Sequence, residues 1–267
     1  MKKTTICFLS GLLGGIAFSH TGIAQDKSLF EKQVFVSTQG DSMPYRILFP
    51  EKYDKSRQYP LIVFLHGSGE RGTDNEKQLI HGADLFLKPK NRKNFPAIVV
   101  FPQCPEDKYW IDISIRSKLG GKGEMNFEES IKSPSEELAI VNELVDQLIQ
   151  EESVDTDRLY LMGLSMGGFG TFETLARWPE RYAAAVGICG GGNLSLTKNY
   201  AKQTALWITH GAKDEVVPVY LSRRLYHALK EQGADVRYTE FPEVGHNAWD
   251  PTFAKKDLLP WLFSNQK

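Results

Sequence analysis

Unbroken apolar runs, separated by helical patterns, constrain the fold of this chain more than any other feature of its sequence. The runs lie at residues 61–65, 97–101, 159–162, 183–188, 206–209 and 236–241. An apolar run without polar alternation is typical of a strand whose two faces are both covered. Helical patterns lie between the runs, and strands that alternate with helices predict a parallel sheet wrapped on both sides.

The same pattern predicts a hairpin and several helix boundaries. Residues 34–38 and 45–49 are β-prone and flank a turn signal at 40–42, so we expect an antiparallel N-terminal strand. Ser133 is expected to cap a helix that has Pro134 at its first position and Glu136 in a capping box. Gly233 is expected to end a helix over 220–232. The expected fold is α/β: one domain over residues 25–267, with an eight-stranded, mostly parallel sheet and helices on both faces.

The first 24 residues have the order of a secretory signal peptide. Lys2 and Lys3 precede an apolar stretch over residues 6–18, and the small-residue site at 22–24 would allow cleavage before Gln25. The stretch is short and Gly-rich for a membrane span, so an uncleaved anchor is the weaker alternative. We therefore expect a secreted or periplasmic protein whose mature chain has no membrane span.

Charge and cysteine content exclude several classes of function. The chain carries 32 Lys and Arg against 33 Asp and Glu, a balance that does not favour nucleic acid or an anionic membrane surface. Three cysteines are too few for a disulfide scaffold. An oxidising compartment would permit a bridge between Cys104 and Cys189. The expected topology puts them at the ends of non-adjacent strands, so two buried, unpaired thiols are favoured.

Residues 111–132 fit neither a strand nor a helix. The segment contains Gly120, Gly121 and Gly123 and is longer than an ordinary strand-to-helix connection. It follows the carboxyl end of a strand, where ligands bind in open α/β sheets. We therefore expect a flap that shapes the substrate site, with a plain surface insertion as the alternative.

A nucleophile elbow is predicted at residues 163–168, whose sequence is Gly-Leu-Ser-Met-Gly-Gly. The motif Gly-x-Ser-x-Gly follows a predicted strand and precedes a helical pattern, which is the context that this motif requires. The turn would lift the hydroxyl of Ser165 clear of the sheet and crowd Gly163 against Gly167. The alternative is a Gly-rich helix entry whose serine merely caps the helix.

A serine hydroxyl needs a base to take its proton and an acid to orient that base, in the chain order Ser, acid, His for this kind of hydrolase. Asp214 lies in the loop after the next-to-last strand, with Glu215 as its competitor. Asp235 and Asp250 are weaker candidates, because the first opens the last strand and the second follows the candidate base.

His246 follows the last predicted strand and occupies the loop where the general base belongs. His210, at a strand end, is expected to be a hydrogen-bonded structural histidine. Ser165, Asp214 and His246 are therefore the predicted catalytic triad.

Acyl transfer also requires backbone donors for the developing oxyanion. The N–H of Met166, directly after the nucleophile, is one expected donor. The loop His-Gly-Ser-Gly-Glu-Arg-Gly at 66–72 is expected to supply the N–H of Ser68, with Gly67 allowing close approach. A tight glycine turn is the alternative there, and His66 is expected to be structural. No His, Cys and carboxylate cluster has ligand spacing, so neither a metal nor an organic cofactor is expected.

Together these motifs resemble the α/β-hydrolase superfamily, and within it the single-domain carboxylesterase/phospholipase-like group related to the catalytic domain of prolyl oligopeptidases. The matching stretches are LHGSGERGTDN at 65–75, FPQCPEDKYW at 101–110, GLSMGGFGTF at 163–172, HGAKDEVVP at 210–218 and GHNAWDP at 245–251. The resemblance implies serine-esterase activity and carries nucleophile, acid and base onto Ser165, Asp214 and His246. It also implies that Trp110 lies near the substrate pocket. Trp249, beside the base, is expected to line the pocket too, unless it is a core aromatic.

The sequence therefore predicts a secreted serine esterase acting on a small-molecule or polysaccharide-linked ester. The resemblance implies acetyl or feruloyl esters of polysaccharides as one substrate class. No β-propeller sequence precedes the domain, which counts against a peptidase of the prolyl oligopeptidase type. A peptidase or acyltransferase with the same triad, and a non-catalytic carbohydrate-binding hydrolase fold, remain as alternatives.

Overall fold

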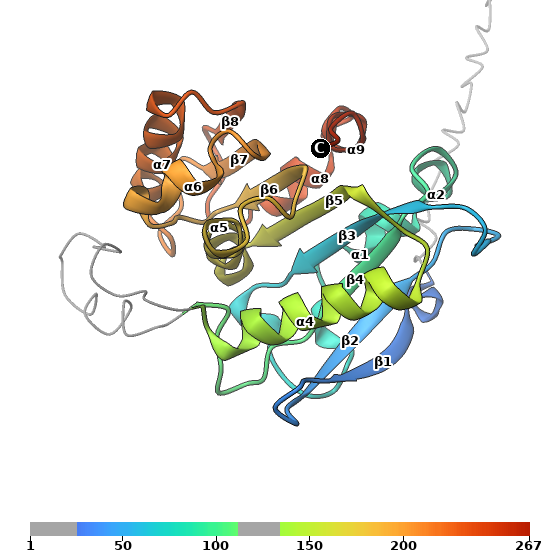
Figure 1. Cartoon of the computed structure of the whole chain (residues 1–267). Coiled ribbons are helices and arrows are strands. Elements are labelled where there is room, and N and C mark those ends of the chain that lie inside the picture. Colours follow the sequence, from blue (N-terminus) through green and yellow to red (C-terminus); the bar gives the residue numbers. More distant parts are fainter. Residues whose placement is uncertain (1–25, 112–133) are drawn as a thin grey trace, which may run out of the picture.

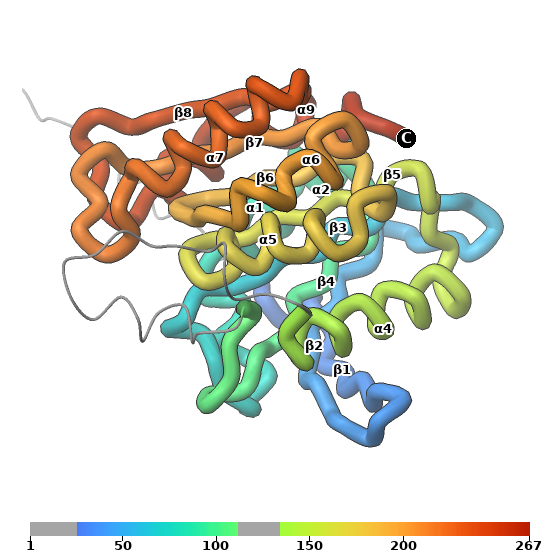
Figure 2. Tube along the Cα trace, turned by 60° about the vertical axis from the view of Figure 1, so that its left-hand side comes forward, coloured from blue at the N-terminus to red at the C-terminus, as the bar shows by residue number. Residues whose placement is uncertain are grey.

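The structure, a computed structural model, describes residues 26–111 and 134–267. These residues form one sheet in the order β1-β2-β4-β3-β5-β6-β7-β8, and Figure 2 shows it running from β1 at one edge to β8 at the other. The strands are β1 (Glu31–Val36), β2 (Ser42–Leu48), β3 (Tyr59–Leu65), β4 (Ile98–Pro102), β5 (Val154–Leu164), β6 (Ala184–Ile188), β7 (Ala205–Gly211) and β8 (Val236–Phe241). Only β2 runs against its neighbours in this described sheet, so the predicted eight-stranded, mostly parallel architecture is confirmed.

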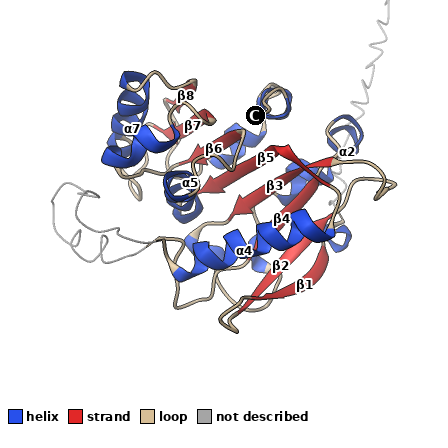
Figure 3. Ribbon diagram, in the orientation of Figure 1, coloured by secondary structure: helices blue, strands red, loops and turns tan. Residues whose placement is uncertain are grey.

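Helices cover both faces of this sheet (Figure 1; Figure 3). One face carries α4 (Glu136–Glu151), α5 (Met166–Arg177), α6 (Thr197–Tyr200) and α7 (Tyr220–Glu231). The opposite face carries α1 (Ala83–Leu87), α8 (Trp249–Phe253) and α9 (Leu258–Phe263), with α2 (Pro89–Asn94) directly after α1. The sheet is therefore the middle layer of three, as the alternation of strands and helices predicts.

The two covered faces explain why the strands are apolar without interruption. Along β3, the side chains of Leu61, Val63 and Leu65 enter the core under α4 and α5. Those of Ile62 and Phe64 enter the core on the other face. Successive side chains of a strand point to opposite faces, so a strand buried on both sides needs apolar residues at every position.

Helix boundaries agree with the sequence in part. Gly233 has φ +76° and follows α7, as a glycine at a helix C-terminus should. The N-cap of α4 is Ser135 rather than the predicted Ser133, because the Ser135 hydroxyl accepts the N–H of Leu138 at 3.2 Å. Ser133 itself lies outside the described residues. The short helices α1, α2, α6 and α8 were not predicted, since four to six residues leave little periodicity to read.

The turn between β5 and α5 is the tightest junction of the fold. Ser165 has φ 53° and ψ −115°, a conformation that L-residues rarely adopt. A Cβ on Gly163 would lie 2.1 Å from the carbonyl oxygen of Gly167, and a Cβ on Gly167 would lie 1.9 Å from that of Leu65. Only glycine fits either position. The Ser165 N–H donates to the carbonyl of Ile188 at 2.8 Å, which ties this turn to the end of β6.

His66 anchors the loop that follows β3. Its Nδ1 lies 2.6 Å from the carbonyl oxygen of Gly67, and its Nε2 lies 3.0 Å from the backbone nitrogen of Cys104. A carbonyl can only accept and an N–H can only donate, so the ring carries its proton on Nδ1 and is neutral. Burial lowers the pKa of His66 to about 4, consistent with this form.

Two further expectations concern the cysteines and membranes. Cys104 and Cys189 are both buried and free, at the ends of the non-adjacent strands β4 and β6, as expected. Within the described ranges, none of the helices combines the length and the apolar character that a membrane crossing requires.

Gly163→Ala is expected to destabilise the fold by about 3 kcal/mol or more, because the new methyl group overlaps a backbone carbonyl that has no room to move. The free energy of unfolding in urea, followed by circular dichroism, measures this loss. Gly69→Ala is the matched control, since no atom lies within 4 Å of the position its Cβ would take. Equal stability of the two variants would contradict the crowding argument.

The neutral His66 predicts a loss of stability in mild acid. The unfolded state binds a proton near pH 6.5, whereas the folded state resists protonation until about pH 4. The contribution of neutral His66 to the free energy of unfolding is therefore fully present above about pH 6.5. It falls as the pH drops toward 4, by roughly 2–3 kcal/mol at pH 4.5. Urea titrations of the native protein and of His66→Asn between pH 7 and 4.5 test this, and only the native protein should show this part of the slope.

Some buried carboxyl groups contribute to the pH dependence of stability with the opposite sign. Burial raises the pKa values of Glu70, Glu137 and Glu173, so their contribution falls as the pH rises. They are present in both proteins and cancel in the comparison. Identical slopes for the native protein and His66→Asn would show that His66 is not held neutral.

Candidate active site

Three loops at the carboxyl ends of β5, β7 and β8 bring Ser165, Asp214 and His246 together. The Nε2 of His246 lies 2.9 Å from the Oγ of Ser165, and its Nδ1 lies 2.7 Å from the Oδ2 of Asp214. The side chain of Asp214 is fully buried, while that of His246 is 20% exposed. An ionised carboxylate can only accept, so Nδ1 donates and Nε2 faces the hydroxyl as an acceptor. The three groups are thus arranged for proton transfer from the hydroxyl to the ring.

Asp214 is held as an ionised carboxylate. Its Oδ1 accepts the N–H groups of Val216 and Val217, each at 2.9 Å. Burial alone would raise its pKa, but hydrogen bonds from His210, His246 and the two N–H groups outweigh burial and hold the pKa of Asp214 well below its usual value. The carboxylate therefore keeps its charge across the neutral pH range.

The other acids considered from the sequence lie elsewhere. Glu215 is exposed. Asp250 is also exposed and accepts a hydrogen bond from the side-chain amide of Asn247 at 2.7 Å. Asp235 directly precedes β8, whereas His246 follows the opposite end of that strand. Of these acids, Asp214 is the one that the structure hydrogen-bonds to His246.

The loop after β3 lies directly against the nucleophile. A Cβ on Gly67 would lie 2.8 Å from the Cδ1 of Leu164 and 3.6 Å from the Cβ of Ser165. Glycine therefore lets the backbone of this loop approach the serine more closely than any other residue could.

The two N–H groups predicted to bind an oxyanion belong to Met166 and Ser68. Met166 occupies the first position of α5, where the N–H has no acceptor within the helix. In a trans peptide the C=O and the N–H point in opposite directions. The carbonyl of Gly67 is held by His66, so the N–H of Ser68, in the same peptide, is directed away from the His66 ring. These are the two donors predicted for an oxyanion.

Further side chains hold the Ser68 loop in place. Gln103 is fully buried, and its amide nitrogen donates to the carbonyl of Glu70 at 3.2 Å while its amide oxygen accepts the N–H of Asn75 at 2.7 Å. The Nε of Arg71 donates to the carbonyl of Ser68 at 2.9 Å. The loop is therefore fixed at several points along its length.

The two predicted pocket tryptophans have different positions. Trp110 is 0% exposed, and its Nε1 donates to the carbonyl of His66 at 3.0 Å. It therefore supports the loop from within the core and presents no accessible face, which corrects its assignment to the pocket. Trp249 is partly exposed, with its ring centroid 5.3 Å from the ring of His246 in an edge-to-face arrangement and 5.1 Å from that of His81. Trp249 is thus beside the candidate base.

Three features near the site were missed from the sequence. His210, expected to be structural, has its Nε2 3.2 Å from the Oδ2 of Asp214. Glu70 is buried, with its Oε1 3.7 Å from the Nε2 of His81. The third is a small apolar cluster of Phe169, Val217 and Leu221. The HGAKD stretch carries the spacing that places His210 next to the acid, but spacing alone does not show which ring atom meets the carboxylate.

One buried cluster has the residue types of a metal site. Potential ligand atoms of Cys189, His210 and Asp214 lie within 4.8 Å of one another. However, the Nε2 of His210 lies 2.9 Å from the carbonyl oxygen of Val217, which requires a proton on that nitrogen. The Oδ2 of Asp214 already accepts from His246. These contacts fit a hydrogen-bonded cluster better than a metal centre.

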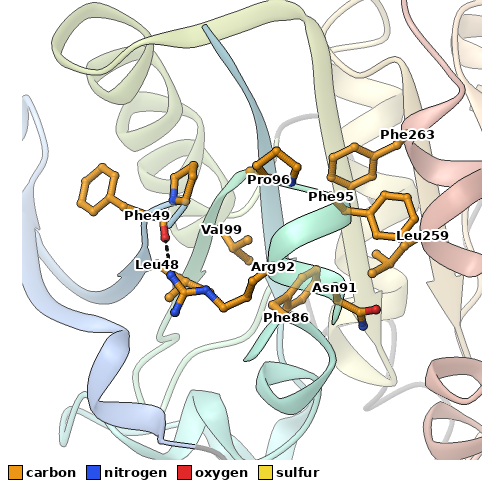
Figure 4. Close-up of a pocket in the computed structure, with 12 residues that line it drawn as sticks. Leu48, Phe49, Phe86, Asn91, Arg92, Phe95, Pro96, Val99, Leu259 and Phe263 are labelled. Carbon is orange, nitrogen blue, oxygen red and sulfur yellow. Dashed lines mark hydrogen bonds between the residues drawn. The ribbon is translucent and has the colours of Figure 1, made fainter. Parts of the chain in front are cut away.

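Figure 4 shows a hollow at the other end of the sheet, near the start of β4. Its lining is mainly apolar and includes Phe86, Phe95 and Phe263, and the Nη2 of Arg92 donates to the carbonyl of Phe49 at 3.0 Å beside it. No pair of nucleophile and base is among its lining residues, so it is not a second candidate active site. Of the predicted flap over 111–132, all but Ile111 lies outside the described residues.

Known proteins are similar to this chain in sequence and in architecture. A sequence model of the family described as Phospholipase/Carboxylesterase matches residues 52–256. Carboxylesterase SOBER1 of Arabidopsis thaliana is 24% identical over 203 residues, which cover 70% of this chain and 82% of that protein. Acyl-protein thioesterase 1 of Emericella nidulans is 28% identical over 209 residues, covering 71% of this chain and 84% of that protein.

A solved structure described as a thermostable esterase superposes with a TM-score of 0.80 at 35% identity. The match covers 90% of this chain and 64% of that one. Since the family match spans most of the chain, the protein belongs to the phospholipase/carboxylesterase family of the α/β-hydrolases and is an ester hydrolase of the serine hydrolase type.

Proposed function

We propose that the protein hydrolyses carboxylic esters through an acyl-enzyme on Ser165. His246, oriented by Asp214, takes the hydroxyl proton as the serine oxygen attacks the ester carbonyl. The C–O bond to the alcohol then breaks, and the alcohol leaves with that proton. Water attacks the acyl-enzyme by the same route, which releases the acid and returns the proton to Ser165.

The tetrahedral oxyanion is stabilised by the N–H groups of Met166 and Ser68. Donors aimed at the place where charge develops lower the barrier, and removing one such donor costs about 10²–10³ in kcat in well-studied serine hydrolases. The close approach of Gly67 to Ser165 supports this role for the Ser68 loop.

The observation that carries the proposal is the unbroken path of hydrogen bonds from Asp214 through His246 to Ser165, at 2.7 and 2.9 Å. A buried acid, an oriented imidazole and a strained serine together serve nucleophilic catalysis. A binding module would gain nothing from the strained conformation of Ser165, which costs about 1–3 kcal/mol.

For the substrate, we propose acetyl or feruloyl esters of polysaccharides, met outside the cytoplasm after cleavage of the leader at residues 1–24. The leader pattern supports the compartment. Trp249 supports a ring-shaped alcohol portion such as a sugar, because its partly exposed ring lies beside His246 and offers a flat contact surface. The apolar cluster of Phe169, Val217 and Leu221, tied to Asp214 by the N–H of Val217, supports a short apolar or aromatic acyl group.

Asp214→Asn is expected to lower kcat/KM by about 10³–10⁴-fold on an activated ester, because the amide no longer fixes the ring tautomer. Glu215→Gln is the matched control, one residue away but exposed, and should stay within about twofold of the native value. Ser165→Ala should abolish both turnover and labelling by a fluorophosphonate probe. Full ester turnover in Ser165→Ala would overturn the mechanism.

Substrate class is tested with a panel of acetyl, butyryl, long-chain acyl and feruloyl esters on sugar and simple alcohols, together with acyl thioesters. Acetyl or feruloyl sugar esters are expected to exceed matched simple esters in kcat/KM by about tenfold, which corresponds to about 1.4 kcal/mol of contact with the Trp249 ring. Trp249→Ala should remove that preference without abolishing turnover. A preference for long acyl thioesters would instead support a thioesterase, while amide turnover would support a peptidase.

A further inference from the structure

Two imidazole rings converge on one oxygen of the Asp214 carboxylate. His246 reaches Oδ2 from the loop after β8 at 2.7 Å, and His210 reaches the same Oδ2 from the end of β7 at 3.2 Å. The side chains of His210 and Asp214 are both 0% exposed, so water does not replace this contact. The predicted structural histidine is therefore in direct contact with the acid of the site.

The hydrogen-bond partners fix a proton on the Nε2 of His210. This nitrogen faces the carbonyl oxygen of Val217 at 2.9 Å and the Oδ2 of Asp214 at 3.2 Å. Both oxygens can only accept, so Nε2 must donate in every state of the ring. The one Nε2–H of His210 therefore serves the carbonyl of Val217 and also lies against the Oδ2 of Asp214, which accepts the N–H of His246.

The other ring nitrogen of His210 can exist with or without a proton. Nδ1 lies 2.7 Å from the Oγ of Ser222, and that hydroxyl lies 2.9 Å from the carbonyl oxygen of Gly190. When the hydroxyl donates to Gly190, Nδ1 is protonated and the ring is a cation. When it donates to Nδ1, the ring is neutral. A rotation of one hydroxyl accommodates both states, and both keep the Nε2–H between the Val217 carbonyl and the Oδ2 of Asp214.

We propose that His210 is a positioning residue that shares the charge of Asp214 and so sets how strongly His246 holds its proton. This inference rests on the proposed function of the triad. A base must be neutral to take the proton of Ser165, and a carboxylate serving one ring alone would favour the protonated ring. A second N–H against Oδ2 disperses that negative charge, so that His246 loses its proton at a lower pH.

Other charged and titratable groups surround this pair of rings. On β8, Glu240 is the register partner of His210 and is paired with Arg223 of α7. At the end of β6, the thiol of Cys189 donates to the carbonyl of His246 at 3.1 Å. Beyond Trp249 lies His81, which is near Glu70. The test variants leave all of these side chains in place, so a change in the pH profile reports on His210.

The test compares His210→Met, which fills the space without a donor, with His210→Gln, whose amide N–H can occupy the place of Nε2. In His210→Met, the midpoint of the acid limb in the profile of kcat/KM against pH should shift to a higher pH by about 0.5–1 unit. His210→Gln should keep a limb close to the native one. A role limited to folding would lower kcat/KM at every pH without moving the limb.

Ser222→Ala keeps the Nε2–H but removes the Oγ that accepts from a protonated Nδ1, so the cationic ring is disfavoured. The neutral ring disperses less of the Asp214 charge, and the limb should therefore shift in the same direction by a smaller amount. It decides the question if the His210 variants do not fold. The inference is overturned if His210→Met, or Ser222→Ala in its place, leaves the limb at the native pH. It is also overturned if His210→Gln moves the limb as far as His210→Met.

A second readout separates this inference from the proposed function. In an inactive Ser165→Ala background, the ring protons of His246 are titrated by NMR with and without His210→Met. The midpoint should rise with His210→Met even when no ester is turned over. Native protein that fails to hydrolyse any ester would reject the proposed function alone, whereas an unchanged midpoint would reject the role of His210.

Discussion

The close approach of three backbone segments at the end of β5 is the constraint on which the rest of the site depends. Gly163, Gly167 and the end of β3 at Leu65 meet at distances that exclude a single methyl group. This contact forces Ser165 into its positive-φ conformation and sets where α5 begins. The position of the hydroxyl is therefore determined by the backbone, and the loops after β7 and β8 only have to reach it.

The parallel sheet supplies the second condition. Because β5, β7 and β8 run in one direction, their carboxyl ends lie at the same edge, and residues separated by 81 positions meet there. The burial of apolar side chains on both faces stabilises this sheet. The same burial leaves the strands with no polar alternation, so the feature that stabilises the sheet is also the one that makes it recognisable.

Much of the fold could be predicted from sequence, and the reasons are local. Continuous apolar runs identify buried strands, and glycines at the β5–α5 junction identify the turn. The Ser133 cap was wrong because Ser133 and Ser135 both suit the role and only the observed bond to Leu138 distinguishes them. The family resemblance placed Trp110 near the pocket, but a resemblance does not fix the direction of a side chain at a loop residue, and the ring of Trp110 lies in the core. The roles of Ser165, Asp214 and His246 stay predictions, although their contacts are now explicit.

The anchoring of the Ser68 loop has a consequence for the energy of catalysis. Its peptide groups are oriented by His66, Gln103 and Arg71 before any substrate arrives. Water around a growing negative charge must turn its dipoles at a cost in free energy, whereas dipoles already fixed in place have no such cost to meet. The predicted oxyanion hole is thus preorganised, because its dipoles took their orientation when the chain folded.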